Sequence, residues 1–159
     1  MRLPGSAGLG AATGLRSMAA PSQLSRYLCE SPGRAAKGRA AGVMAWPAAR
    51  SVLQFAALGE MVVDKLPIVP DRIEAGPLLG RVVWGAVAGG VLAQLNRESC
   101  IQGALLGGAA AAAATATYAG YYVRKALTQD EGLPDLPVAL SEDVIAIALA
   151  RHACQGAGT

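Results

Sequence analysis

The longest uncharged stretch of the chain limits its possible folds more than any other feature. Its apolar part, residues 101–123, has 23 residues without a charged side chain. As an α-helix this run would extend roughly 34 Å, at about 1.5 Å per residue, and the hydrocarbon core of a bilayer is about 30 Å thick. Three tyrosines near its end are followed by Arg124 and Lys125. Aromatic residues followed by cations are typical of the end of a transmembrane helix.

Composition favours the same interpretation. The 159 residues include 34 alanines and 20 glycines, apolar residues make up 53% and charged residues only 16%, against roughly 25% in soluble domains. The low charge excludes a disordered chain. Aromatic residues account for 4%, so a core of bulky rings cannot form. A soluble Ala-rich helical binding module remains an alternative, but it would need polar helix faces that residues 101–123 barely provide.

Four further apolar segments complete the expected architecture, at about residues 6–28, 45–66, 76–95 and 136–150. The first is interrupted by Arg16 and Pro21, and the last is short for a span. A basic polar loop is expected over residues 29–44. The sequence therefore predicts an all-α fold, a polytopic transmembrane bundle of four or five Gly/Ala-rich helices in one domain over 1–159.

Two short similarities within the chain raise the question of an internal repeat. Residues 9–12 (LGAA) resemble 106–109 (LGGA), and residues 57–60 (ALGE) resemble 139–142 (ALSE). A duplication would place the first and fourth helices in opposite directions, as in the inverted repeats of many transporters. Matches of small residues also arise by chance in such a chain, so both interpretations stay open.

Glycines are spaced as in closely packed membrane helices. Pairs four residues apart occur at 76/80, 85/89 and 103/107, and such pairs let helix backbones approach. The run Gly8–Gly14 imitates a dinucleotide-binding loop, but only seven residues precede it. Because that loop needs a preceding strand, helix packing is the favoured role of these glycines.

Charge and cysteine content exclude several functions. The net charge is +3, and the cations between Arg26 and Arg50 lack interleaved aromatics, which favours a cytoplasmic membrane loop over a nucleic-acid partner. The cysteines are three in number without a CxxC pair, and His152 is the single histidine. Neither a disulfide framework nor a metal site is indicated. No catalytic residues, cofactor or enzymatic activity are expected.

The carboxylates within apolar segments are the candidate functional groups. Glu60 and Asp64 are four residues apart and share a helix face. Carboxylates inside a membrane are costly, so they face a cation, the bundle interior or a water path. Together with Glu142 and Asp143 they are candidate ion or proton sites. A structural interpretation stays open, in which they pair helices through the candidate partners Arg16, Lys65 and Arg81.

Four stretches together resemble a known family of membrane proteins: Gly14–Ser17, Gly59–Pro67, Tyr118–Tyr122 and Leu133–Asp143. They resemble the small bacterial integral membrane proteins catalogued as domain of unknown function 4126. The resemblance covers nearly the whole chain and implies a polytopic membrane protein without an assigned activity.

The favoured function is a small transporter-like protein for an ion or small solute, in multiple passes through a bacterial cytoplasmic membrane. A non-transporting structural or assembly membrane protein is the alternative. The lipid bilayer is the expected partner, and a homo-oligomer is left open. Positive charge predicts a cytoplasmic loop 29–44, which places the N-terminus and residues 67–75 outside and residues 96–100 and the C-terminus inside.

Overall fold

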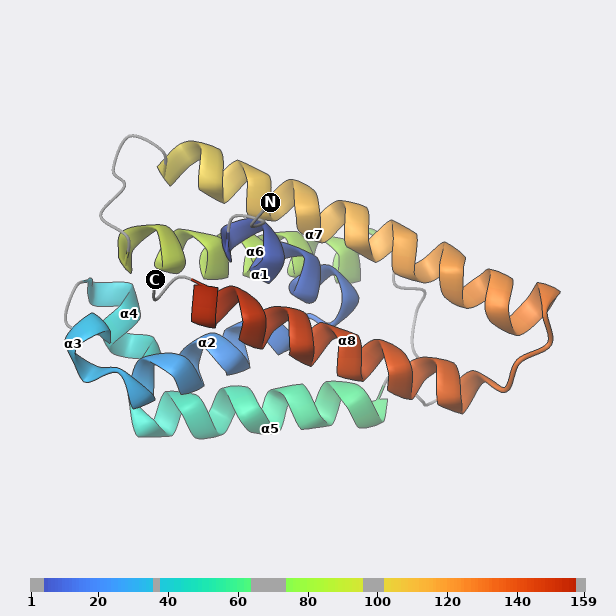
Figure 1. The fold of residues 1–159 in the computed structure, drawn as a ribbon, viewed down its shortest axis with the longest axis horizontal. Helices are drawn as coiled ribbons and strands as arrows, with labels where there is room; N and C mark the ends of the chain where they lie inside the picture. The colour runs from blue at the N-terminus through green and yellow to red at the C-terminus, as the bar shows by residue number, and fades with distance from the viewer. Residues whose placement is uncertain (1–4, 36–37, 64–73, 96–101, 157–159) are drawn as a thin grey trace.

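The chain folds into packed helices (Figure 1). The computed structural model describes residues 5–35, 38–63, 74–95 and 102–156, and these contain no strand. The prediction of an all-α fold is therefore confirmed. The elements in chain order are α1 Gly5–Leu15, α2 Ala19–Glu30, α3 Pro32–Ala35, α4 Arg39–Met44, α5 Pro47–Val63, α6 Ala75–Leu95, α7 Gln102–Lys125, the π-helical turn η1 Ala126–Asp130, and α8 Asp135–Gly156.

The predicted first segment, 6–28, is not one continuous helix. The chain leaves the helical path at residues 16–18 and resumes it as α2. Pro21 lies in the first turn of α2, where its missing N–H costs nothing. In an uninterrupted helix its ring would collide with the carbonyl of Ser17, four residues earlier, so the helix cannot continue through this point.

Helices α1 and α2 fold back on each other as a helical hairpin (Figure 1). A Cβ on Gly5 of α1 would lie 3.0 Å from the carbonyl oxygen of Ala153 in α8. The far end of α2, at Tyr27 and Glu30, borders the same end of α8 at Cys154. The start of α1 and the end of α2 therefore lie at the same end of the molecule. The prediction that residues 6–28 form one helix that crosses the membrane is wrong.

Glycines bring α1 into backbone contact with α7. A Cβ on Gly10 would lie 2.1 Å from the carbonyl oxygen of Ala109, and one on Gly14 would lie 2.2 Å from that of Ala113. No side chain fits there, so the packing role predicted for these glycines is confirmed. Among the predicted glycine pairs, Gly85 packs against Ala113, whereas Gly76 and Gly80 meet nothing within 4 Å.

The same contacts set the relative direction of the two helices. Gly10 and Gly14 meet Ala109 and Ala113 in the same order along both chains, so α1 and α7 run parallel. The inverted repeat required opposite directions for this pair. That arrangement is therefore wrong for the first and fourth predicted segments.

Among the described residues, α6 is the only helix long and apolar enough to be a membrane span by itself, over Ala75–Leu92. Helix α7 has the length, but its glycines, threonines and tyrosines and the terminal Arg124 and Lys125 lower its mean hydropathy. Helix α8 contains Glu142, Asp143 and Arg151. A bundle of four or five spans is therefore not confirmed by these criteria.

Beside an apolar core that includes Leu9, Leu24 and Leu92, the molecule exposes large apolar side chains and buries several charged ones. Helix α5 has no buried residue, and its Phe55 is 74% exposed. Large apolar side chains on α6, α7 and α8 are also exposed. In contrast, Arg16 is only 1% exposed, and Arg81, Glu142 and Asp143 are buried as well. In soluble proteins such charged residues are almost never buried unless they are paired.

Candidate functional site

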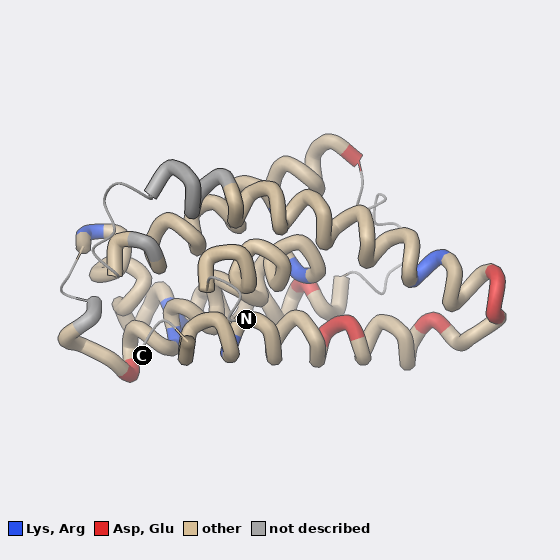
Figure 2. The backbone as a smooth tube through the Cα atoms, turned by 45° about the horizontal axis from the view of Figure 1, so that its top comes forward, with Lys and Arg blue, Asp and Glu red and all other residues tan. Residues whose placement is uncertain are grey.

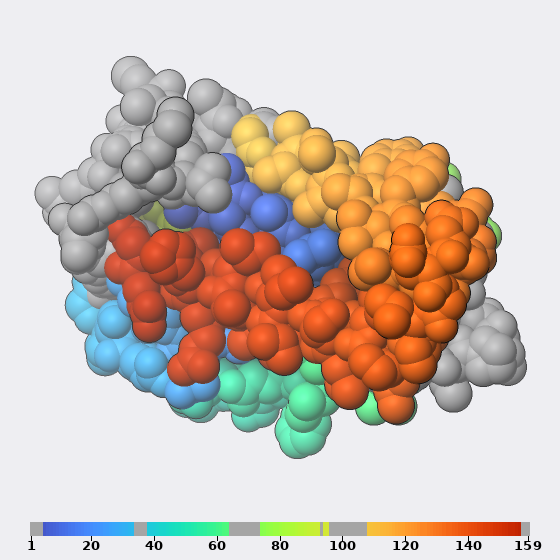
Figure 3. Space-filling model, turned by 45° about the vertical axis from the view of Figure 1, so that its right-hand side comes forward, coloured from blue at the N-terminus to red at the C-terminus, as the bar shows by residue number. Residues whose placement is uncertain are grey.

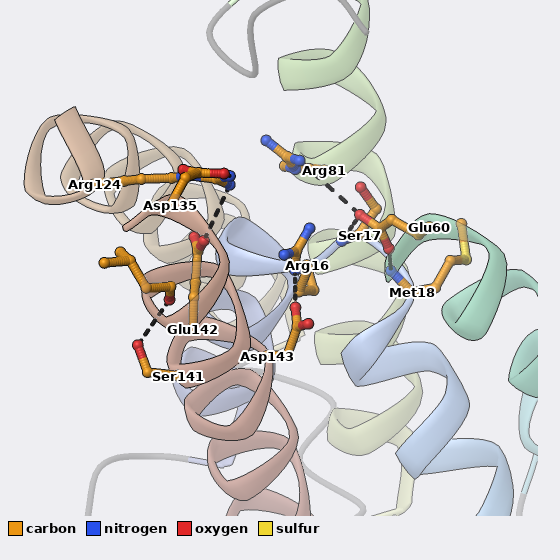
Figure 4. A network of polar contacts seen from close by, with 11 residues as sticks. Arg16, Ser17, Met18, Glu60, Arg81, Arg124, Asp135, Ser141, Glu142 and Asp143 are labelled. Atoms are coloured by element: carbon orange, nitrogen blue, oxygen red, sulfur yellow. Dashed lines mark hydrogen bonds and ion pairs between the residues drawn. The ribbon is translucent and has the colours of Figure 1, made fainter. Parts of the chain in front are cut away.

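The tip of the α1–α2 hairpin gathers charged side chains from four other elements (Figure 4). We call the following seven residues the tip network: Arg16, Glu60, Arg81, Arg124, Asp135, Glu142 and Asp143. They come from the hairpin tip, α5, α6, α7 and α8. The network joins Glu60, Glu142 and Asp143, three of the predicted ion or proton sites, with the predicted pairing residues Arg16 and Arg81. Asp64 and Lys65 lie outside the described residues.

Glu60 caps the start of α2. Its Oε1 accepts a hydrogen bond from the backbone N–H of Ser17 at 2.7 Å, and its Oε2 accepts one from Met18 at 2.8 Å. The first N–H groups of a helix have no partner within the helix, and they favour a negative charge. Arg81 adds an Nη2 atom 4.0 Å from Oε1. Both oxygens of this predicted ion site therefore hold the hairpin tip in place.

Arg16 pairs with α8 rather than with Glu60. Its Nε lies 2.5 Å from Oδ1 of Asp143, and both side chains are buried. Of the predicted pairing residues that the structure describes, Arg81 is the one that lies beside Glu60. A buried ion pair is costly to break from one side, because the remaining charge is left in a low-dielectric interior. This pair fixes the hairpin tip to the middle of α8.

Arg124 belongs to the network although the sequence indicated only an interfacial cation. Its Nε and Nη2 bind the two carboxylate oxygens of Asp135 at 2.8 and 2.6 Å, a bidentate geometry specific to arginine. Its Nη1 lies 3.9 Å from Oε2 of Glu142. The chain reverses between Arg124 and Asp135 at Gly132, whose φ of 69° favours glycine.

The sequence analysis also missed Thr117, which satisfies a backbone carbonyl at the end of α1. The Thr117 hydroxyl of α7 lies 3.0 Å from the carbonyl oxygen of Gly14 and 2.8 Å from that of Ala113. It can donate to one of these at a time. The Gly14 carbonyl belongs to the last turn of α1, where carbonyls lack helical partners. No periodic pattern marks Thr117, since its role depends on α7 lying against α1.

A pocket of about 290 Å³ adjoins the network between α7 and α8. Its floor is Leu15 of α1, and Figure 3 shows α1 exposed between these two helices. Most of its lining is apolar, with Arg124, Ser141 and Glu142 as the polar residues. Glu60 does not line it, so the two predicted glutamate sites do not share this pocket. Within the described part of the chain, no group of three or more His, Cys, Asp or Glu side chains could hold a metal ion.

Comparison of the chain with known protein families, with curated proteins and with solved structures found no match. The resemblance to the domain of unknown function 4126 therefore stays a prediction.

Proposed function

We propose that this protein is a multi-pass carrier of the bacterial cytoplasmic membrane that moves an ion or small solute through the tip network. The observation that supports this most is the combination of an exposed apolar surface with buried charged groups. A surface with Phe55 and Val52 exposed on α5 suits lipid, and the buried guanidinium and carboxylate groups suit a polar path. A soluble helical module would expose that apolar surface to water.

In this proposal helices α5 to α8 cross the membrane. Helices α6, α7 and α8 have 21, 24 and 22 residues, and about 20 residues are enough for a bilayer core. Their alanine and glycine are small residues, which are favoured where helices pack closely in lipid.

The hairpin would enter the membrane from one side and return to it. Irregular backbone at membrane depth is tolerated only where protein satisfies its polar groups, and Glu60 and Thr117 do this at the hairpin tip. Discontinuous helices in transporters place such ends beside the transported ion. The contacts of Glu60 favour a structural role for this residue, so we assign the transport role to Glu142, which lines a pocket.

Two experiments test the proposal. Extraction of membranes with carbonate at high pH should leave the protein in the pellet, and its release into the supernatant would contradict membrane integration. Reconstituted proteoliposomes should show flux above empty vesicles for a member of a broad panel of cations and small solutes. A pelleted protein without flux across that panel would instead support the alternative of a structural or assembly protein.

A further inference from the structure

We propose that the pocket between α7 and α8 binds a lipophilic organic cation, with Glu142 as its counter-charge. The inference rests on the proposed function, because it names the class of solute that the same network would take.

The lining of the pocket suits an apolar body. Besides the three polar residues, it is formed by Leu15, Ala119, Gly120, Val123, Leu127, Val138 and Ile145. At about 290 Å³, the space is close to the roughly 300 Å³ at which pockets for small molecules begin. Val123 and Ile145 are also largely exposed on the outer surface. A solute dissolved in the lipid could therefore reach the pocket from the side.

Gly120 leaves the Glu142 carboxylate within reach of the pocket. A Cβ on Gly120 would lie 3.1 Å from Oε1 of Glu142 and 3.1 Å from Cδ2 of Leu15. Any larger side chain on α7 would therefore crowd this oxygen. Glu142 is 8% exposed, so a charge brought to it would interact in a low-dielectric setting, where attraction is stronger than in water.

The charges around Glu142 favour a cation over an anion. Arg124 is the nearest guanidinium that lines the pocket, but it binds Asp135 at 2.6 and 2.8 Å and lies 3.9 Å from Glu142. The lining holds one guanidinium, Arg124, and one carboxylate, Glu142, and Asp135 beside the pocket balances the charge of Arg124. A small metal ion would lose its hydration shell to a mostly apolar lining that supplies few oxygens. An organic cation is weakly hydrated and avoids this loss.

Binding of tetraphenylphosphonium to the purified full-length chain in detergent tests the proposal. Equilibrium dialysis should show saturable binding, and Glu142→Gln should weaken it at least tenfold. The matched control is Glu131→Gln, which removes the same charge from an exposed residue outside the pocket lining and should leave the affinity unchanged.

Variants of Arg124 and Asp135, the ion pair beside Glu142, are expected to change the affinity in opposite directions. Asp135→Asn frees Arg124 to move toward Glu142 and should weaken binding, whereas Arg124→Gln removes the competing cation and should tighten it. A gain of affinity cannot result from misfolding. Equal affinity in Glu142→Gln and the unchanged protein would overturn the proposal and indicate a pocket filled by lipid chains. The protein could stay in the membrane pellet after carbonate extraction and transport another solute, yet not bind tetraphenylphosphonium. That result would overturn this inference and leave the proposed function standing.

Discussion

Glu60 is the residue whose role changes most between sequence and structure. The sequence placed it among the candidate ion or proton sites. In the structure both carboxylate oxygens accept backbone N–H groups at the hairpin tip. A glutamine offers one carbonyl oxygen and presents an NH₂ group to the second donor.

We therefore expect Glu60→Gln to destabilise the protein. The two donors are part-buried, so the loss should stay below the roughly 1–3 kcal/mol that an unsatisfied buried donor costs, and the Tm in detergent should fall accordingly. Glu30→Gln, near the other end of α2, is the control: it removes an exposed ion pair with Arg26, which typically contributes under about 1 kcal/mol, and should change Tm less. An unaltered Tm in Glu60→Gln would show that the cap is dispensable.

The buried pair of Arg16 and Asp143 gives a second prediction at this scale. Asp143→Asn leaves the guanidinium buried without its carboxylate at 2.5 Å, and breaking such a pair typically costs about 3–5 kcal/mol. Replacing both residues, Arg16→Met with Asp143→Leu, should recover much of the loss, because no buried charge then remains. Thermal unfolding of both variants in detergent measures this. A double variant less stable than Asp143→Asn would contradict the argument.

At the scale of elements, the hairpin depends on glycine contacts as well as on charge. Helix α1 lies so close to α7 that its Gly10 cannot carry a Cβ without displacing the backbone at Ala109. In lipid, such close approach takes the place of the hydrophobic driving force between helices. The position of the tip network thus follows from residues that have no polar chemistry.

Replacing single glycines by alanine separates the effect of helix packing on stability from the effect of helix propensity. Gly10→Ala should lower Tm strongly, because its Cβ would lie 2.1 Å from a carbonyl oxygen. Gly80→Ala in α6 meets nothing within 4 Å and should be neutral or slightly stabilising, since alanine is about 1 kcal/mol better than glycine in a helix. Equal Tm values for the two variants would contradict the close contact of α1 with α7.

At the scale of the whole molecule, the two ends differ in charge (Figure 2). The end where α2 finishes and α5 begins carries Arg26, Arg39, Arg50 and Arg151 against Glu30. The end where α7 passes into α8 carries Asp130, Glu131 and Asp135 beside Arg124 and Lys125. Positive charge marks the cytoplasmic side. Because α1 begins at the basic end, we expect its start to be cytoplasmic, not outside as the sequence indicated.

Cysteine accessibility tests this orientation. In a chain whose native cysteines are replaced by serine, Glu131→Cys should react with a membrane-impermeant maleimide in intact cells. His152→Cys, exposed at the basic end, should react only after the cells are permeabilised. The reverse pattern would refute the orientation, and labelling of both in intact cells would refute the membrane-spanning arrangement.

The sequence alone determined the class of fold and the approximate extent of several helices. Segments predicted at 76–95 and 101–123 correspond to α6 and α7, whose ends differ from the predicted ones by at most two residues. These features depend on neighbouring residues: runs without charge, prolines that end helices, and glycine spacing. Pro21 was also visible as an interruption of the first segment.

Only the tertiary structure decided that the chain reverses its direction between α1 and α2. It also decided which charged side chains form ion pairs. Arg16 pairs with Asp143 rather than with Glu60, and Arg124 binds Asp135. A helix forms from hydrogen bonds between residues four apart, so local sequence can specify it. An ion pair between different helices depends instead on which helix faces touch, and close contacts such as that of Gly10 and Gly14 with α7 exist only in the folded chain.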